Sequence, residues 1–317
     1  MVTFGYFLAS EEHGPDELVR QARLAERAGF EALWISDHFH PWIDEQGESP
    51  FVWTVIGALS QAVSLPVTTA VTCPIIRIHP VIIAQAAATA QVMLHGRFRL
   101  GVGTGEALNE HVVGAPWPPA AERLEMLEEA VEVIRRLWSG GVLTHRGVHY
   151  DVDTARLYTL PEEPPPIYMS GFGPKAISLA ARIADGFMST APQRESVERF
   201  RKEGGDGKPA QAGVKVCWAE DEAEARRTAH RLWPNQGIPG EAAQLLPMPR
   251  HFEQLAGLVA EEHVARTVAY GPDPEAHAEM IRRYVDAGFD EVYVSQIGPR
   301  QEEFFACYRD QVLPRVR

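Results

Sequence analysis

Strand-like and helix-like segments alternate along almost the whole chain, and this alternation limits the possible folds more than any other feature. The strand-like segments are short and apolar, and they lie at 2–8, 31–36, 66–72, 97–102, 166–170, 185–189, 213–218 and 291–296. Longer segments with apolar residues at helical spacing separate them, at 15–28, 51–63, 80–94, 121–138, from 174 onward and at 301–312. Eight strands that alternate with helices predict an α/β fold, the (β/α)8 TIM barrel.

The segments outside this pattern are predicted to be insertions in a single barrel domain of residues 1–317. Residues that favour strands flank Thr144-His145-Arg146-Gly147. They predict a hairpin over 142–152 with this tetrapeptide as its turn. The stretch 232–265 begins with several Pro and Gly residues and predicts a helical insertion between the seventh strand and the final helix.

The charge and the cysteine content exclude several classes of protein. The net charge is −13, and no run of Lys and Arg is interleaved with aromatic residues, so nucleic acid is not an expected partner. Cys73, Cys217 and Cys307 are odd in number and far apart, which favours free thiols in a reducing cytoplasm. No leader peptide and no apolar run of about 18 residues is visible. We therefore expect a cytoplasmic protein that acts on a small molecule and does not bind membranes.

A turn of small residues after the fourth strand is the most distinctive local pattern. It runs from Gly101 to Gly105 through Thr104, and Glu106 and Asn109 follow it at once. Glycines let a backbone approach a bulky ligand closely. Glu106 is then either a reactive carboxylate or an acid that stabilises a helix N-terminus, and capping is the alternative role for Thr104 and Asn109. The full Gly-x-Gly-x-x-Gly pattern is absent, so a dinucleotide-binding reading is rejected.

The second strand ends in Asp37 and His38, which gives a second group of titratable residues at a strand end. Histidine is the usual proton shuttle near neutral pH, although a loop histidine without a role is the alternative. Trp42 either forms a wall of a ligand site or caps the barrel mouth. His38 and His40 have no third partner at a spacing typical of metal ligands, so we expect no metal site. In a parallel barrel the strand ends meet at one face, which predicts a single active site.

Three other segments carry candidate binding residues. The segment 170–176 (Ser-Gly-Phe-Gly-Pro-Lys-Ala) follows the fifth strand and opens a helix, where free N–H groups and Lys175 suit a phosphate. An ordinary turn with Pro at the first helical position is the alternative. Thr190 follows the sixth strand and could hydrogen-bond a substrate. Arg266 could neutralise an anionic substrate or pair with an acidic residue on a helix.

With these motifs in place, the chain resembles the luciferase-like flavin and deazaflavin oxidoreductases, and among them the F420-dependent glucose-6-phosphate dehydrogenase group. The segments that carry the resemblance are Ser36-Asp37-His38-Phe39, Pro41-Trp42, the run from Gly101 to Glu110, Leu137-Trp138-Ser139-Gly140 and Asp185-Gly186-Phe187. The group's cofactor is coenzyme F420, a deazaflavin that carries a hydride at C5. The resemblance implies cofactor contacts at Asp37, Ala70, Val71, Cys73, Thr104, Gly105, Asn109, Gly171, Phe172, Gly173, Lys175 and Ala176.

The resemblance also implies the reaction centre. It assigns catalysis to His38, Glu106 and Trp42, places Glu11 at the barrel mouth, and puts a non-prolyl cis peptide between Ala70 and Val71, behind the cofactor. In sugar-phosphate dehydrogenases of this group two lysines and an arginine hold the substrate phosphate. Arg266 matches the arginine, but Gln193 stands where one lysine belongs and 240–244 holds no lysine. With Arg266 as the one evident cation beside Glu11, Thr190 and Gln193, we expect a neutral or singly charged substrate.

These observations predict an F420-dependent oxidoreductase that acts on a CH–OH group. It would transfer a hydride between C5 of the deazaflavin and a secondary alcohol, a lactol, a sugar or a sugar phosphate. One alternative is an FMN-dependent luciferase-like monooxygenase, and another is a deazaflavin-binding protein without turnover. The resemblance further implies a homodimer.

Overall fold

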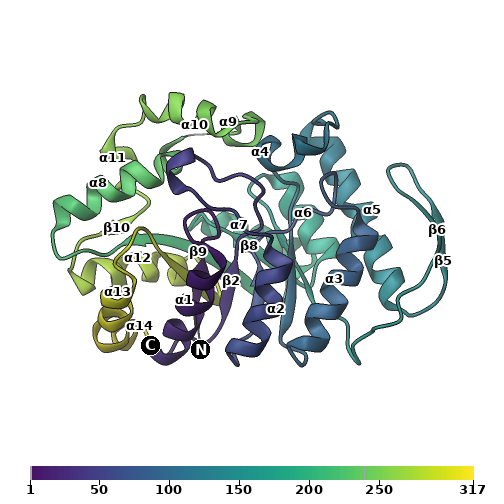
Figure 1. Ribbon diagram of the computed structural model, residues 1–317, viewed down its shortest axis with the longest axis horizontal. Coiled ribbons are helices and arrows are strands. Elements are labelled where there is room, and N and C mark those ends of the chain that lie inside the picture. The colour runs from purple at the N-terminus through teal and green to yellow at the C-terminus, as the bar shows by residue number, and fades with distance from the viewer. Residues whose placement is uncertain (1, 239) are drawn as a thin grey trace.

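The computed structural model describes residues 2–238 and 240–317 and confirms the barrel (Figure 1). Its eight strands are β1 (Thr3–Leu8), β2 (Leu33–Ile35), β3 (Val67–Thr69), β4 (Phe98–Val102), β7 (Ile167–Ser170), β8 (Gly186–Ser189), β9 (Ala210–Cys217) and β11 (Glu291–Gln296). Parallel pairing runs in the order β1, β2, β3, β4, β7, β8, β9, β11 and returns to β1, which closes the ring. A short additional strand, β10 (Ala269–Tyr270), pairs with β9.

Helices surround the barrel and bury one face each against its strands (Figure 1). They are α1 (Pro15–Ala28), α2 (Val52–Ala62), α3 (Pro80–Met93), α5 (Ala120–Trp138), α6 (Pro174–Ile183), α7 (Arg194–Phe200), α12 (Pro274–Asp286) and α13 (Gln301–Cys307). Helix α1 shows why these segments are helical. Pro15 occupies its first turn, Leu18 and Ala22 lie on its buried face, and Gly29 ends it in the left-handed conformation. After α13 the chain ends in a π-helical turn, η5 (Tyr308–Val312), and α14 (Leu313–Val316).

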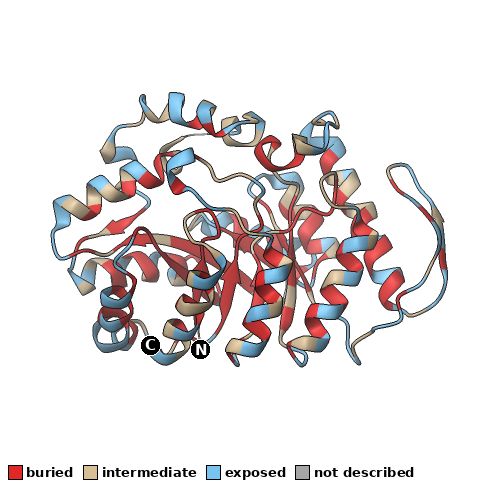
Figure 2. Cartoon of the chain, in the orientation of Figure 1, coloured by how far each residue is buried: buried red, intermediate tan, exposed pale blue. Residues whose placement is uncertain are grey.

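Side chains fill the interior of the barrel. Trp34 and Tyr293 stack with their ring centroids 4.6 Å apart, and Phe7, Tyr168 and Met188 pack in the same buried cluster. Figure 2 shows the strands as the most continuously buried part of the molecule. Because the barrel is a packed core with no open pore, ligands are confined to its mouth at the carboxyl ends of the strands.

Short helices lie over the carboxyl ends of the strands (Figure 1). They are α4 (Ala107–Glu110), η2 (His111–Val113), α8 (Glu222–Leu232), η4 (Pro234–Gly237), α9 (Ala242–Leu245), α10 (Pro249–Ala256) and α11 (Glu261–Val264), and a single turn, η1 (Asp44–Gln46), follows β2. We refer to η4, α9, α10 and α11, all within the stretch 232–265, as the cap. The buried ring of Phe252 on α10 meets the Trp42 ring edge-on at a centroid distance of 5.2 Å. This contact joins the cap to the loop that carries the candidate histidine.

Three strands differ from their predicted ranges by two or more residues at one end. The second covers 33–35 instead of 31–36, and the third ends at Thr69 instead of residue 72. The peptide bond between Ala70 and Val71 is cis, as expected. The seventh strand begins at Ala210, three residues before the predicted start. The apolar pattern did not predict the first three residues of this strand, because they include the buried polar residue Gln211. The Gln211 side chain accepts a hydrogen bond from the Trp34 indole at 2.9 Å.

The predicted hairpin exists, but its turn was placed wrongly. Its strands are β5 (Leu143–Arg146) and β6 (Asp151–Ala155), so three of the four residues predicted to form the turn are extended. The turn lies at 147–150 because the Glu129 carboxylate of α5 accepts hydrogen bonds from the backbone N–H groups of Val148, His149 and Tyr150. The hairpin projects from one side of the barrel, away from the cap (Figure 1).

The structure also bears on the thiols and on membrane insertion. Cys73, Cys217 and Cys307 are all buried and free, as expected. Within residues 2–238 and 240–317, no helix combines the length and the apolar character needed to cross a membrane.

Candidate active site

Residues that follow β1 and β2 meet at the barrel mouth, where the resemblance places Glu11. Glu11, after β1, is 3% exposed, and its Oε1 lies 3.5 Å from Nε2 of His38, after β2. The Ser36 hydroxyl donates to Glu11 Oε2 at 2.7 Å. The carboxylate is therefore held in place by the protein and faces the imidazole.

Asn109 connects two of the three candidate catalytic residues, His38 and Glu106. Its Oδ1 accepts hydrogen bonds from the backbone N–H groups of Phe39, at 2.9 Å, and His40, at 3.1 Å, which fixes the orientation of the amide. Its Nδ2 then lies 3.1 Å from His38 Nδ1 and 3.5 Å from Glu106 Oε2. Asn109 thus does not act as a helix cap here. It holds the loop after β2 against α4 and joins His38 to Glu106.

His38 has a hydrogen-bond partner in each protonation state. Its Nδ1 lies 3.1 Å both from the His40 carbonyl oxygen and from the Asn109 amide nitrogen. With the proton on Nδ1, the ring donates to the carbonyl and leaves Nε2 free to accept a proton; without it, Nδ1 accepts from the amide. The Trp42 ring lies 5.2 Å from the imidazole, centroid to centroid. This arrangement suits a reversible proton acceptor beside an aromatic wall.

Glu106 is the residue that precedes α4, the place where an acid could cap the helix. Its side chain makes no capping hydrogen bond, and it is partly exposed at the mouth. Its closest polar contact is the amide nitrogen of Asn109 at 3.5 Å. The carboxylate therefore remains available to a ligand.

A buried ion cluster lies beside this centre and includes an arginine that the sequence did not single out. Arg77 Nη2 binds Asp37 Oδ1 at 2.7 Å, and its Nε is 3.6 Å from Glu110 Oε1. The other oxygen of Asp37 accepts from the Thr72 hydroxyl at 2.7 Å. Each oxygen of the Asp37 carboxylate is thus already bound within the protein. Arg77 lies in a loop and has no local pattern that marks it; only the fold brings it to Asp37 and Glu110.

Burial raises the pKa of Glu110 to about 7, although Arg77 opposes this shift. The carboxyl therefore binds its proton more tightly in the folded state than at its ordinary pKa of 4.5, and folding loses stability as pH rises through about 7. In the Glu110→Gln variant the side chain at this position does not ionise. Relative to the wild-type protein, the free energy of unfolding of this variant should increase by about 2.5 kcal/mol between pH 5 and pH 8. Urea unfolding at the two pH values measures this difference.

The exposed residue Glu198 provides the control for this experiment. Glu198→Gln should give the same difference from the wild-type protein at both pH values. The attraction of Arg77 for the ionised carboxylate is already contained in the pKa of about 7, so the comparison needs no separate correction for it. Parallel stability curves for Glu110→Gln and the wild-type protein would contradict the assigned titration.

Lys215 is the main residue of the site that sequence reasoning missed. It projects from β9, and its Nζ lies 3.2 Å from the ring centroid of Trp233 and 5.1 Å from that of Phe7. Burial lowers the pKa of Lys215 to about 8, against the opposing effect of Glu11 and Glu12. Burial would raise the pKa of Glu11, but His38, Lys215 and Ser36 together lower it. The sequence does hold one sign that Lys215 is unusual: it stands between two valines in a predicted strand.

A pocket of about 240 Å³ opens beside Lys215 at the barrel mouth, and we call it the cationic pocket. Three of its lining residues are cations, Lys215, Arg266 and Arg283, and no carboxylate is among the described residues that line it. The prediction that Arg266 is the one cation on this side was therefore wrong. Lys215 belongs to β9 and Arg283 to α12, and neither is a close neighbour of Arg266 in the sequence, so their approach is a product of the fold.

The two remaining candidate substrate residues differ in position. Thr190 lines the cationic pocket, as its place after β8 suggested. Gln193 is not among the residues that line it; it precedes α7, and its Oε1 accepts a hydrogen bond from the Ser196 hydroxyl at 3.2 Å.

The turn after β7 forms an open cradle at the start of α6. A Cβ atom on Gly173 would meet nothing within 4 Å, so space remains there for a ligand. Phe172 and Lys175 are exposed, and Lys175 forms no ion pair with the described residues. Gly171 differs, because its Cβ would come within 3.2 Å of Ala176. Free N–H groups and an unpaired lysine suit a phosphate.

Three glycines, one within β4 and two in the turn after it, leave room for neighbouring protein atoms. A Cβ on Gly101 would lie 1.8 Å from the Thr69 carbonyl oxygen, and one on Gly103 would lie 2.7 Å from Val71 Cγ2. At Gly105, where φ is +68°, a Cβ would be 3.1 Å from Cys73 Sγ. These glycines allow close packing against the β3 side of the barrel. The expected approach of this backbone to a ligand stays a prediction.

The two histidines of the loop after β2 face different partners. His40 Nδ1 contacts the Leu108 carbonyl oxygen at 2.9 Å, whereas His38 faces Glu11. Over the part of the chain that the structure describes, no group of three or more His, Cys, Asp or Glu side chains is arranged to hold a metal ion.

Comparison with known proteins identifies relatives along the entire length. The sequence model of the family described as luciferase-like monooxygenase matches residues 2–291. A protein of Microbacterium testaceum named F420-dependent glucose-6-phosphate dehydrogenase is 37% identical over 328 residues, which cover 99% of this chain and 97% of the relative. A protein of Nakamurella multipartita with the same name is 38% identical and covers 100% of this chain and 97% of the relative.

Solved structures agree with these sequence relatives. An F420-dependent secondary alcohol dehydrogenase, solved in complex with an F420-acetone adduct, superimposes with a TM-score of 0.93 at 30% sequence identity. The match covers 100% of this chain and 99% of that structure. An F420-dependent tetrahydromethanopterin reductase from Methanopyrus kandleri, at 22% identity and a TM-score of 0.79, shares the fold.

Proposed function

The chain belongs to the luciferase-like family, and on that premise we propose that it is a coenzyme F420-dependent oxidoreductase. It transfers a hydride between a secondary alcohol, lactol or sugar and C5 of the deazaflavin. The observation that carries this proposal is the connection of His38 to Glu106 through Asn109 at the barrel mouth. The match to an F420-dependent secondary alcohol dehydrogenase over the whole chain supports it.

The residues present fit the coenzyme. The cradle at Gly173 leaves space that a Cβ would enter freely, and Lys175 beside it is exposed and unpaired among the described residues. These groups, together with the N–H groups that open α6, would hold its phosphate. Asn109, Thr104 and the cis-linked Ala70 and Val71 lie at strand ends of the same mouth. When bound, the deazaflavin accepts or donates a hydride at C5.

The side chains of the mouth handle the protons of the reaction. His38 accepts the hydroxyl proton at Nε2 as the hydride leaves the substrate carbon, and Nδ1–H meanwhile donates to the His40 carbonyl. The Glu11 carboxylate, 3.5 Å from Nε2, stabilises the imidazolium that forms. Glu106 supplies or accepts a proton on the cofactor side, and Trp42 positions the substrate.

The cationic pocket bears on the substrate. Its three cations, Lys215, Arg266 and Arg283, favour a substrate with a negatively charged group. This revises the expectation of a neutral or singly charged substrate, which rested on Arg266 alone. Sugar phosphates therefore remain candidate substrates although Gln193 replaces a lysine.

Titration of the purified protein with F420 and with FMN tests the cofactor. We expect quenching of the deazaflavin fluorescence with a much lower Kd than that for FMN, and no oxygen consumption by the reduced complex. Lys175→Glu should raise the Kd for F420 by about tenfold or more, because a charge-assisted phosphate contact is lost.

Lys202→Glu, at another exposed lysine, should leave this Kd unchanged. FMN binding as tight as that of F420, with oxygen uptake, would support the FMN-dependent monooxygenase instead. Tight F420 binding without turnover of any alcohol or sugar would support the non-catalytic binding protein.

Two further proposals concern the oligomeric state and the location of the protein. We propose a homodimer because the resemblance implies one, and a cytoplasmic location because the three thiols are free and buried.

A further inference from the structure

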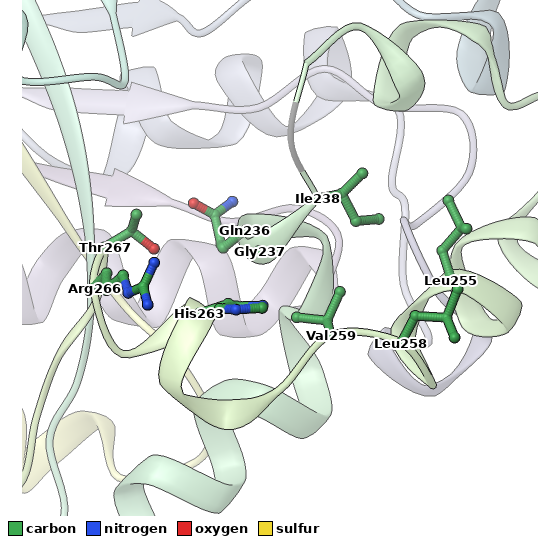
Figure 3. Close-up of a pocket in the computed structure, with 9 residues that line it drawn as sticks. All are labelled: Gln236, Gly237, Ile238, Leu255, Leu258, Val259, His263, Arg266 and Thr267. Atoms are coloured by element: carbon green, nitrogen blue, oxygen red, sulfur yellow. The ribbon is translucent and has the colours of Figure 1, made fainter.

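The cap contains a second, larger pocket that the proposed reaction does not use. It measures about 540 Å³, a size typical of small-molecule sites, and we call it the apolar pocket. Four of the nine residues that line it have apolar side chains: Ile238, Leu255, Leu258 and Val259. Figure 3 shows Leu255 and Leu258 at one end of this pocket and Arg266 and Thr267 at the other.

The apolar pocket adjoins the cationic pocket. Gln236, Arg266 and Thr267 line both, so the two pockets share one wall. Arg266 is exposed and forms no ion pair with residues 2–238 or 240–317. A ligand held by this guanidinium would therefore reach Lys215 on one side and the apolar side chains of the cap on the other.

One side chain of the apolar wall is largely uncovered in the protein alone, and the other three are partly buried. Leu258 is 80% exposed, although it lies in the loop between α10 and α11 next to the partly buried Val259. Burial of such a side chain by an apolar group is favourable, and a concave site that combines apolar walls with a few polar groups is typical of small-molecule binding.

We propose, on the basis of the proposed function, that the substrate is amphiphilic. Its anionic group binds between Arg266 and Lys215, and an apolar group attached to it occupies the apolar pocket against Leu255 and Leu258. The continuity of the two pockets through Arg266 favours the substrate itself as the occupant over a second copy of the chain. Selectivity would then increase with the length of the apolar group.

Straight-chain carboxylates from butanoate to octanoate probe this arrangement, because each combines one anionic group with an alkyl chain. Their Kd values are measured by calorimetry on the purified protein, without F420 and then with it. We expect Kd to fall by about fourfold for each added methylene until the pocket is filled. Leu258→Asp should abolish this dependence on chain length.

Val148→Asp provides the matched control, because Val148 is 88% exposed and lies in the hairpin, away from the cap. It should keep the wild-type dependence. A Kd that does not change with chain length, or an unchanged dependence in Leu258→Asp, would overturn the proposal. Loss of self-association in Leu258→Asp, with the wild-type dependence kept, would instead assign the surface to contacts between copies. Binding of carboxylates does not require F420, so failure here is distinguishable from failure of the cofactor titration.

Discussion

Replacement of His38 by alanine is expected to lower kcat by about 10² to 10⁴, the usual contribution of a positioned acid–base group. The imidazole is the group whose Nε2 faces the Glu11 carboxylate at 3.5 Å, and its Nδ1 has partners in both protonation states. Alanine removes the proton acceptor but leaves the Arg77–Asp37 ion pair in place. The Kd for F420 should therefore change little. Steady-state kinetics with the best substrate, together with the cofactor titration, measures both quantities.

His40→Ala is the matched control, two residues further along the same loop. Its side chain contacts the Leu108 carbonyl oxygen and does not face Glu11. We expect kcat to change by much less than in His38→Ala. Near-normal turnover by His38→Ala, or equal losses in the two variants, would show that His38 is not the proton acceptor.

Gly101→Ala is expected to prevent stable folding. The new Cβ would lie 1.8 Å from the Thr69 carbonyl oxygen and 2.8 Å from Met188 Sδ. The carbonyl cannot retreat, because Gly101 also exchanges hydrogen bonds of 2.9 and 3.0 Å with the Thr69 hydroxyl. We expect a loss of about 4 kcal/mol or more, a large part of the stability of an ordinary domain. Soluble yield and urea unfolding measure the effect.

Gly141→Ala is the control substitution, because a Cβ at that exposed position meets nothing within 4 Å. Its stability should stay within about 0.5 kcal/mol of the wild-type value. A Gly101→Ala protein that unfolds at the wild-type urea concentration would show that the barrel accommodates the methyl group by a backbone shift.

The sequence was sufficient for those features that depend on short stretches of chain. Alternating apolar strands and amphipathic helices predicted the barrel, because burial of one face per element leaves few other arrangements. The positions of His38, Glu106 and Asn109 after strands placed them at one face of the molecule, since parallel strands all end there. The predicted start of a strand was wrong where a buried polar residue interrupts the apolar pattern, as Gln211 does in β9.

Only the tertiary structure decided which distant groups meet. Lys215, Arg266 and Arg283 line one pocket although they lie on β9, in the loop after α11 and on α12, and Arg77 reaches Asp37 across 40 residues. The tertiary structure also decides why residue 101 must be glycine, because a Cβ there would collide with a carbonyl oxygen of the neighbouring strand β3. Local sequence encodes the periodicity of an element and the residue types at its end. The charge that a side chain faces, and the space left beside a backbone, depend on elements that the closure of the barrel brings together from all parts of the chain.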